Sequence, residues 1–155
     1  MLVEELLLKS VARRTLTKTG KMPHLYIADD NTDFAEYVAT SARRMGWTVD
    51  IFSDGKDFLE NVPVTRSVAL MLLDVNMPEL DGIQTISKIS SLEHVLRIRF
   101  MTGGPVSSIN AANTIAKGKN LNVGQSIFKP LRLDTLKEIL EHEAIALSEL
   151  ERSSA

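Results

Sequence analysis

Short apolar runs alternate along this chain with longer segments in which apolar residues recur every three or four positions. A short apolar run bounded by turn residues predicts a buried strand, and the three-to-four spacing predicts an amphipathic helix. The predicted strands cover residues 24–28, 47–52, 68–73, 96–101 and 126–128. The predicted helices cover residues 2–17, about 32–45, 54–62, 83–89, 105–118 and 133 to about 150, with residues 119–125 as a loop.

This alternation predicts an α/β fold, with five strand–helix units and one extra helix in front of them. Strands that alternate with helices form a parallel sheet, whose right-handed crossovers bring all carboxyl ends of the strands to one edge. The run from Val68 to Leu73 is entirely apolar and leads directly into Asp74. Such a run is typical of a central parallel strand covered on both faces, and ligands bind at the carboxyl ends of such strands. Asp74 is therefore the first candidate for chemistry.

Three of the other four predicted strands are followed by a residue that could join Asp74 in a site. Asp29 and Asp30 follow the first strand, Thr102 follows the fourth and Lys129 follows the fifth. Three neighbouring carboxylates repel one another unless a cation lies among them, and a hard divalent ion such as Mg²⁺ prefers oxygen ligands. Lys129 and Thr102 are suited to a further anion, such as a phosphoryl group. The sequence therefore predicts a Mg²⁺ and phosphoryl site at this edge.

Each of these residues also has an ordinary structural interpretation. Acidic residues after a strand are common turn and capping residues, and we interpret Asp81 beside Gly82 in that way. Thr102 alone would most often be a cap, and Lys129 alone a solvated surface charge. What favours a site is that all these side chains follow consecutive strands.

Composition excludes several classes of protein. The chain has 155 residues, 44% of them hydrophobic and 25% charged, which is typical of one folded domain. Its formal net charge of −2 gives no support to nucleic-acid binding, and no apolar run is long enough to span a membrane. The absence of cysteine excludes disulfides and thiolate chemistry and fits a cytoplasmic protein. Glu4 and Glu5 argue against a targeting peptide at the start.

Other polar and aromatic features are weaker signals. His24, His94 and His142 have no ligand spacing, and we expect them to be packing or surface residues. Trp47 is expected to pack near the edge of the sheet.

The order of the site residues resembles a known family. Asp29-Asp30, the block from Asp74 to Gly82, Thr102 and Lys129-Pro130 together resemble the receiver (CheY-like) domain of two-component response regulators. The similarity extends over about residues 23–142, which leaves residues 1–22 as an amphipathic helical extension and 143–155 as an extension of the last helix with a frayed tail. It implies a flavodoxin-like doubly wound sheet of strand order 2-1-3-4-5.

The resemblance also implies roles for the site residues. Asp74 would be the phosphoacceptor, and Asp29, Asp30, Asp74 and the backbone carbonyl of Asn76 would provide ligands for Mg²⁺. Lys129 would pair with the phosphoryl oxygens, Thr102 would donate a hydrogen bond to one of them, and the Lys129–Pro130 bond would be cis. The partner implied is a sensor histidine kinase or a histidine phosphotransfer protein, followed by an unknown downstream protein.

The chain departs from the family's usual pattern at two places. Receivers of this kind usually carry Tyr or Phe three residues before the lysine, where this chain has Ser126. The sequence therefore does not predict the aromatic form of the switch. The interval between Thr102 and Lys129 also looks longer than usual, and residues 119–125 are the expected extra material.

We expect a stand-alone signalling receiver that is not an enzyme beyond its own phosphotransfer and autodephosphorylation. The apolar stripe at Val3, Leu7 and Val11 suggests that the first helix, together with the last, forms a packing or homodimer surface. Two alternatives remain: a Mg²⁺-dependent phosphohydrolase with an aspartyl-phosphate intermediate, and a degenerate receiver that acts only as a protein-binding module. The hydrolase is disfavoured because enzymes of that type carry a second acid two residues after the nucleophile, where this chain has Asn76.

Overall fold

The computed structural model describes residues 22–63, 68–76, 82–89 and 95–154. The helix predicted for residues 2–17, Asp81 and His94 lie outside the described residues. The elements are β1 (His24–Ala28), α2 (Thr32–Arg44), β2 (Thr48–Phe52), α3 (Gly55–Asn61), β3 (Ala69–Asp74), α4 (Gly82–Ile89), β4 (Leu96–Thr102), α5 (Val106–Gly118), β5 (Asn122–Val123), β6 (Ile127–Phe128) and α6 (Leu133–Ser154).

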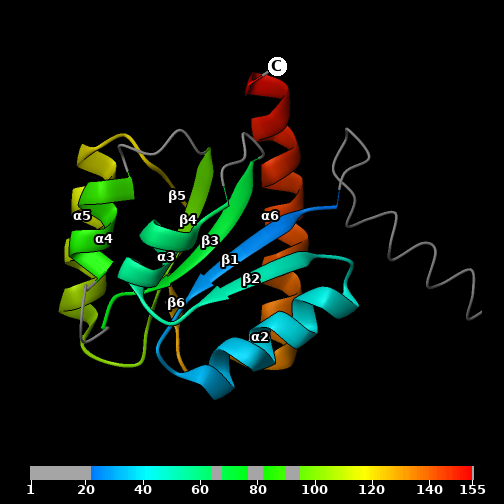
Figure 1. The fold of residues 1–155 in the computed structure, drawn as a ribbon, viewed down its shortest axis with the longest axis horizontal. Helices are drawn as coiled ribbons and strands as arrows, with labels where there is room; N and C mark the ends of the chain where they lie inside the picture. Colours follow the sequence, from blue (N-terminus) through cyan, green and yellow to red (C-terminus); the bar gives the residue numbers. More distant parts are fainter. Residues whose placement is uncertain (1–21, 64–67, 77–81, 90–94, 155) are drawn as a thin grey trace, which may run out of the picture.

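All strand pairs in the sheet are parallel, in the order β2-β1-β3-β4-β5, with β6 also paired to β4 (Figure 1). The strand order expected of a flavodoxin-like fold is therefore confirmed. Helices α2 and α6 cover one face of the sheet, and α3, α4 and α5 cover the other (Figure 1). No helix among the described residues is long and apolar enough to cross a membrane.

Strand β3 is the centre of both hydrophobic cores. Every residue from Ala69 to Asp74 is buried. Leu70 and Leu72 pack into the core under α2 and α6, while Met71 and Leu73 pack into the opposite core. This alternation follows from the two-residue period of a strand, and it confirms the prediction of a central strand covered on both faces. Asp74 is then the last residue of a strand that is buried along its whole length.

Helix α2 begins and ends as its sequence predicts. The side chain of Asn31 accepts a hydrogen bond from the backbone N–H of Phe34, which caps the first turn. Gly46 ends the segment with a φ of 92°, a conformation that glycine adopts without steric cost. Trp47 follows and is buried under α2 and α6, beside the edge strand β2, as expected.

The prediction for the fifth strand was wrong in part. Residues 119–125 were expected to be a loop, but Asn122–Val123 form β5, and β6 begins at Ile127. Ile98 pairs with Val123 and Met101 with Ile127, so three steps along β4 correspond to four along its partner. The fifth strand is thus one strand interrupted by a one-residue bulge. Each of the two strands is only two residues long, and Gly124 lies between them. The two-residue period of a strand therefore cannot be recognised in this part of the sequence.

Two helix boundaries also differ from the prediction. Pro105 caps α5 and the helix begins at Val106. Helix α6 continues to Ser154, so Ser153 is helical although it was expected to fray. Its hydroxyl donates a hydrogen bond to the backbone carbonyl of Glu149, which supports the last turn.

Gly55 should be intolerant of a side chain. An added Cβ would lie 1.8 Å from the Oγ1 atom of Thr85, a fully buried residue on α4. We expect Gly55→Ala to lower the free energy of unfolding by about 1–3 kcal/mol through overpacking, measured by chemical denaturation. Gly118→Ala is the matched control, because nothing lies within 4 Å of its added Cβ, and it should be neutral or stabilising. Equal stability of Gly55→Ala and the wild type would contradict this packing.

Candidate functional site

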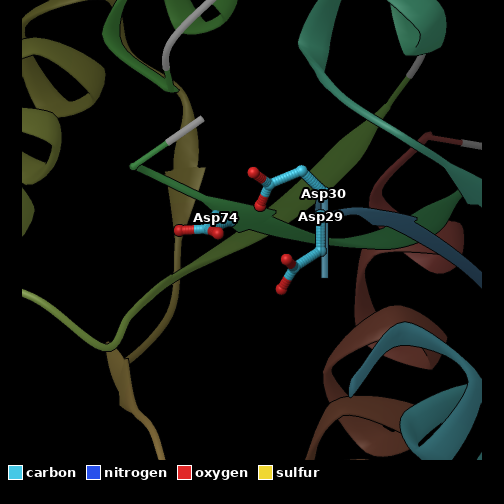
Figure 2. A group of neighbouring side chains, drawn as sticks. All are labelled: Asp29, Asp30 and Asp74. Atoms are coloured by element: carbon cyan, nitrogen blue, oxygen red, sulfur yellow. The ribbon is translucent and has the colours of Figure 1, made fainter. Parts of the chain in front are cut away.

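Three carboxylates gather at the carboxyl ends of β1 and β3 (Figure 2). Asp29 and Asp30 directly follow β1, and Asp74 is the last residue of β3. Each offers an oxygen that lies within 4.8 Å of the others. Asp29 and Asp74 are buried, whereas Asp30 is exposed. The structure thus brings together the three acids that the sequence predicted to be neighbours.

The backbone fixes the two buried carboxylates. Asp29 Oδ1 accepts a hydrogen bond of 2.9 Å from the N–H of Asn31, and Asp74 Oδ1 accepts one of 3.0 Å from the N–H of Asn76. In both cases the aspartate side chain accepts a hydrogen bond from the backbone N–H two residues later in the chain, which is a common local turn. The second oxygen of each carboxylate is left facing the site.

Lys129 contacts the Oδ2 atoms of both Asp29 and Asp74. Its Nζ lies 2.6 Å from Asp29 Oδ2 and 3.4 Å from Asp74 Oδ2. The ring of Phe34 lies beneath the ammonium group, with Nζ 4.5 Å from the ring centroid. The Lys129–Pro130 bond is cis, as expected. Lys129 is therefore held against the acids rather than solvated at the surface.

The site carries more negative than positive charge. Among the described residues this cluster holds three carboxylates and one ammonium group, and the ammonium contacts two of the carboxylates. Burial raises the pKa of the Asp29 carboxyl, and the negative charge of Asp74 raises it further, although the hydrogen bonds from Lys129 and Asn31 partly oppose the rise. The donor set consists of oxygens in a cluster with an excess of negative charge, and this is the kind of site that Mg²⁺ occupies. The residues present therefore fit a divalent cation.

The Thr102 hydroxyl lies beside this cluster and is held by two donors. The residue is 1% exposed at the end of β4. Its Oγ1 accepts hydrogen bonds from the Nδ2 of Asn76 at 2.6 Å and from the N–H of Gly104 at 2.9 Å. With both lone pairs engaged, the hydroxyl proton remains available for donation. The sequence does not predict this side-chain contact of Asn76, for which only the backbone carbonyl is expected in the site.

Ser126 stands where the family usually has an aromatic residue, and its side chain forms a hydrogen bond to a helix. Its Oγ accepts a hydrogen bond of 2.9 Å from the Nδ2 of Asn113 on α5. The bond joins α5 to the bulge between β5 and β6. Asn113 was not predicted to take part, because nothing in the sequence pattern links it to a residue 13 positions away.

The described histidines are packing or surface residues, as expected. His24 is at the start of β1, at the opposite edge of the sheet, where its ring contacts Thr48 and Asp50. His142 is an exposed residue of α6.

Comparison with known proteins assigns the family. The model of the response regulator receiver domain matches residues 25–141. The sensor protein EvgS of Escherichia coli O157:H7 is 32% identical over 126 residues, which are 81% of this chain and 10% of EvgS. The response regulator receiver protein CpdR of Brucella abortus is 25% identical over 125 residues, 81% of this chain and 99% of CpdR. The chain thus spans a tenth of one relative and nearly all of the other.

Solved structures agree on the fold. The crystal structure of a response regulator from Colwellia psychrerythraea superimposes with a TM-score of 0.68 at 22% sequence identity, over 80% of this chain and 98% of that one. The chain belongs to the response regulator receiver family, and this supports a role in two-component signalling.

Proposed function

We propose that this protein accepts a phosphoryl group on Asp74 from a phosphohistidine donor, in a reaction that depends on Mg²⁺. The observation that carries the proposal is the position of Lys129, whose ammonium lies against both Asp29 and Asp74 at the ends of adjacent strands. In the reaction, a carboxylate oxygen of Asp74 forms a bond to phosphorus. The bond between phosphorus and the imidazole nitrogen of the donor breaks, and that nitrogen keeps the electron pair.

The backbone prepares Asp74 for this attack. Because Asp74 Oδ1 is held by the N–H of Asn76, the carboxylate has one orientation, and Oδ2 is left to react. Burial of Asp74 limits its hydration, which leaves the nucleophile less shielded by water.

Asp29, Asp30, Asp74 and the backbone carbonyl of Asn76 would hold the Mg²⁺ ion. When bound, this ion supplies positive charge for the phosphoryl oxygens. Lys129 supplies the second positive charge, because its Nζ is already 3.4 Å from Asp74 Oδ2. The free hydroxyl proton of Thr102 would be donated to a third oxygen. Together these groups would stabilise the negative charge of the phosphoryl group that is transferred to Asp74.

The partner that supplies the phosphoryl group is proposed to be a sensor histidine kinase or a histidine phosphotransfer protein. The phosphorylated chain would then signal by contact with a downstream protein or pass the group onward. Ser126 would alter the route of this signal, because its hydrogen bond to Asn113 joins the bulge directly to α5.

Incubation with acetyl phosphate and Mg²⁺, followed by intact mass measurement, tests the proposal. A single phosphoryl adduct that accumulates, and that Asp74→Asn lacks, is the expected result. Rapid multiple turnover of acetyl phosphate without an adduct would support a phosphohydrolase. No adduct from acetyl phosphate or a phosphohistidine donor would support a module that only binds protein.

Binding of Mg²⁺ should weaken as the pH falls, beginning above the range in which an ordinary aspartate titrates. The raised pKa of Asp29 means that a proton competes with the metal at a higher pH than usual. Calorimetric titration at several pH values would measure this. Asp29→Asn should reduce the affinity at least about tenfold, since removing even a group that only orients a ligand has that effect.

Asp33→Asn provides the control for the Mg²⁺ titration. Asp33 is an exposed acid in the first turn of α2, and its loss removes the same charge without removing a proposed ligand. An equal loss of affinity in both variants would mean that the metal responds to the general field and not to Asp29.

A further inference from the structure

Two aromatic side chains of helix α2 contact the segment that carries Lys129. The ring of Phe34 lies under the Lys129 ammonium, with Nζ 4.5 Å from the ring centroid. The hydroxyl of Tyr37 donates a hydrogen bond of 3.0 Å to the backbone carbonyl of Leu131. The two rings also pack together, with their centroids 6.3 Å apart. Helix α2 thus holds both the side chain of Lys129 and the backbone that follows it.

The turn that fixes the carboxylate of Asp29 also determines where Phe34 lies. Asp29 Oδ1 accepts a hydrogen bond from the N–H of Asn31, and Asn31 Oδ1 accepts one of 3.0 Å from the N–H of Phe34. Asn31 is therefore both the turn residue beside the acids and the N-cap of α2. Because Phe34 lies in the first turn of that helix, local backbone structure sets the position of its ring relative to Asp29.

The described residues give the Lys129 ammonium three electrostatic contacts, which are of two kinds. Two are with Asp29 Oδ2 at 2.6 Å and Asp74 Oδ2 at 3.4 Å, and the third is with the Phe34 ring. Both carboxylates are proposed ligands of Mg²⁺, and Asp74 is also the proposed phosphoacceptor. The π face of the ring attracts a cation but is not a ligand that Mg²⁺ would use. The ring is therefore the contact that can keep the ammonium at the site while the carboxylates bind other groups.

The surroundings of this cation–π pair limit its access to water. The side chain of Lys129 is 16% exposed, and Phe34 is partly buried against the core under α2 and α6. A cation–π contact contributes most where the cation has lost water. The lysine side chain is also long and flexible, so a contact that restricts its conformations prepares it for a reaction at Asp74.

We propose that Phe34 is a positioning residue for phosphoryl acceptance, and that its ring holds the Lys129 ammonium beside Asp74. This inference rests on the proposed function and deepens it, because it adds a residue that acts on the reaction through Lys129. The effect of the ring on phosphoryl uptake must then disappear when the ammonium is absent.

Phe34→Leu tests the ring, because leucine keeps an apolar side chain at this position but has no π face. It should slow phosphoryl uptake from acetyl phosphate and Mg²⁺ by about two- to thirtyfold, which corresponds to the loss of one cation–π contact. Phe34→Tyr is the matched variant, since it keeps the ring, and its rate of uptake should be close to that of the wild type. Wild-type uptake by Phe34→Leu would overturn the proposal.

A double-mutant cycle separates positioning of Lys129 from general damage to α2. In a Lys129→Ala background, Phe34→Leu should have no further effect on the rate of uptake, because there is no ammonium left to position. An equal slowing by Phe34→Leu with and without Lys129 would show that the ring acts in another way, and would overturn the proposal.

The contact itself can be observed without phosphoryl transfer, by nuclear magnetic resonance of the ¹³C-labelled full chain. Protons over the face of an aromatic ring resonate upfield, so the Cε protons of Lys129 should be shifted upfield. The shift should persist in Phe34→Tyr and on addition of Mg²⁺, and it should vanish in Phe34→Leu. An unshifted Lys129 in the wild type, or a shift that is lost when Mg²⁺ is added, would overturn the proposal.

Together the two measurements distinguish a failure of this inference from a failure of the proposed function. Uptake on Asp74 that does not respond to Phe34→Leu would reject the positioning role alone. No uptake by the wild type, although the Lys129 shift depends on the ring, would reject phosphoryl acceptance and with it the role of Phe34.

Discussion

Replacing Glu143 with alanine should lower the free energy of unfolding by about 3–5 kcal/mol, the cost of breaking a buried ion pair by removing one partner. Glu143 is fully buried and is the shared acceptor for Arg97 and Arg99. Without it, neither guanidinium group between β4 and α6 has an ion-pair partner among the described residues. The effect should therefore exceed that of an ordinary polar substitution, which chemical denaturation would show.

Glu141→Ala is the matched control for that measurement. It lies two residues away on the same helix but is exposed, so its loss should change stability little. Glu143→Gln keeps the shape and one acceptor oxygen, and its cost should be intermediate. If Glu143→Ala were as stable as Glu141→Ala, the arginines would be hydrated or rearranged, and the cluster would not stabilise the contact between β4 and α6.

Lys129→Ala should slow phosphoryl uptake from acetyl phosphate by about 10²–10³-fold, as removal of one group that stabilises developing charge typically does. The same change should tighten binding of Mg²⁺, because the ammonium that repels the metal from Asp29 and Asp74 is gone. These opposite effects distinguish loss of charge stabilisation from general damage to the site. The rate of adduct formation by mass and the calorimetric affinity for Mg²⁺ would measure them.

Lys137→Ala removes an exposed positive charge from α6 and should leave both quantities unchanged. A Lys129→Ala protein that took up phosphoryl groups at the wild-type rate would contradict the role assigned to Lys129. A parallel loss of uptake and of Mg²⁺ affinity would instead indicate that the substitution disrupts the acids.

The sequence predicted most of the fold because its signals are local. The all-apolar run from Val68 to Leu73 identified the central strand, and its burial on both faces is what that pattern requires. Parallel connection of the strands then placed Asp29, Asp30 and Asp74 together without knowledge of their coordinates. The strand order itself came from the resemblance to receivers, since periodicity does not specify which strands are neighbours.

The features that escaped prediction depend on contacts between distant residues. Glu143 and Arg99 are 44 positions apart, and Asn76 and Thr102 are 26 apart, so no local spacing reveals either pair. Glu143 looks like any polar residue of an amphipathic helix until α6 is placed over β4. The strand at residues 122–123 escaped prediction for a different reason. Two residues beside Gly124 are too few to show the two-residue period of a strand.

Peptide mapping after borohydride reduction tests the central claim most directly. The chain would be treated with acetyl phosphate and Mg²⁺, and the reduction converts an aspartyl phosphate to homoserine at the residue that carried the phosphoryl group. We expect the conversion at Asp74 alone, with none in a sample prepared without Mg²⁺. Conversion at Asp29 or Asp30, or a phosphoryl adduct that survives in Asp74→Asn, would contradict the assignment of Asp74 as the acceptor.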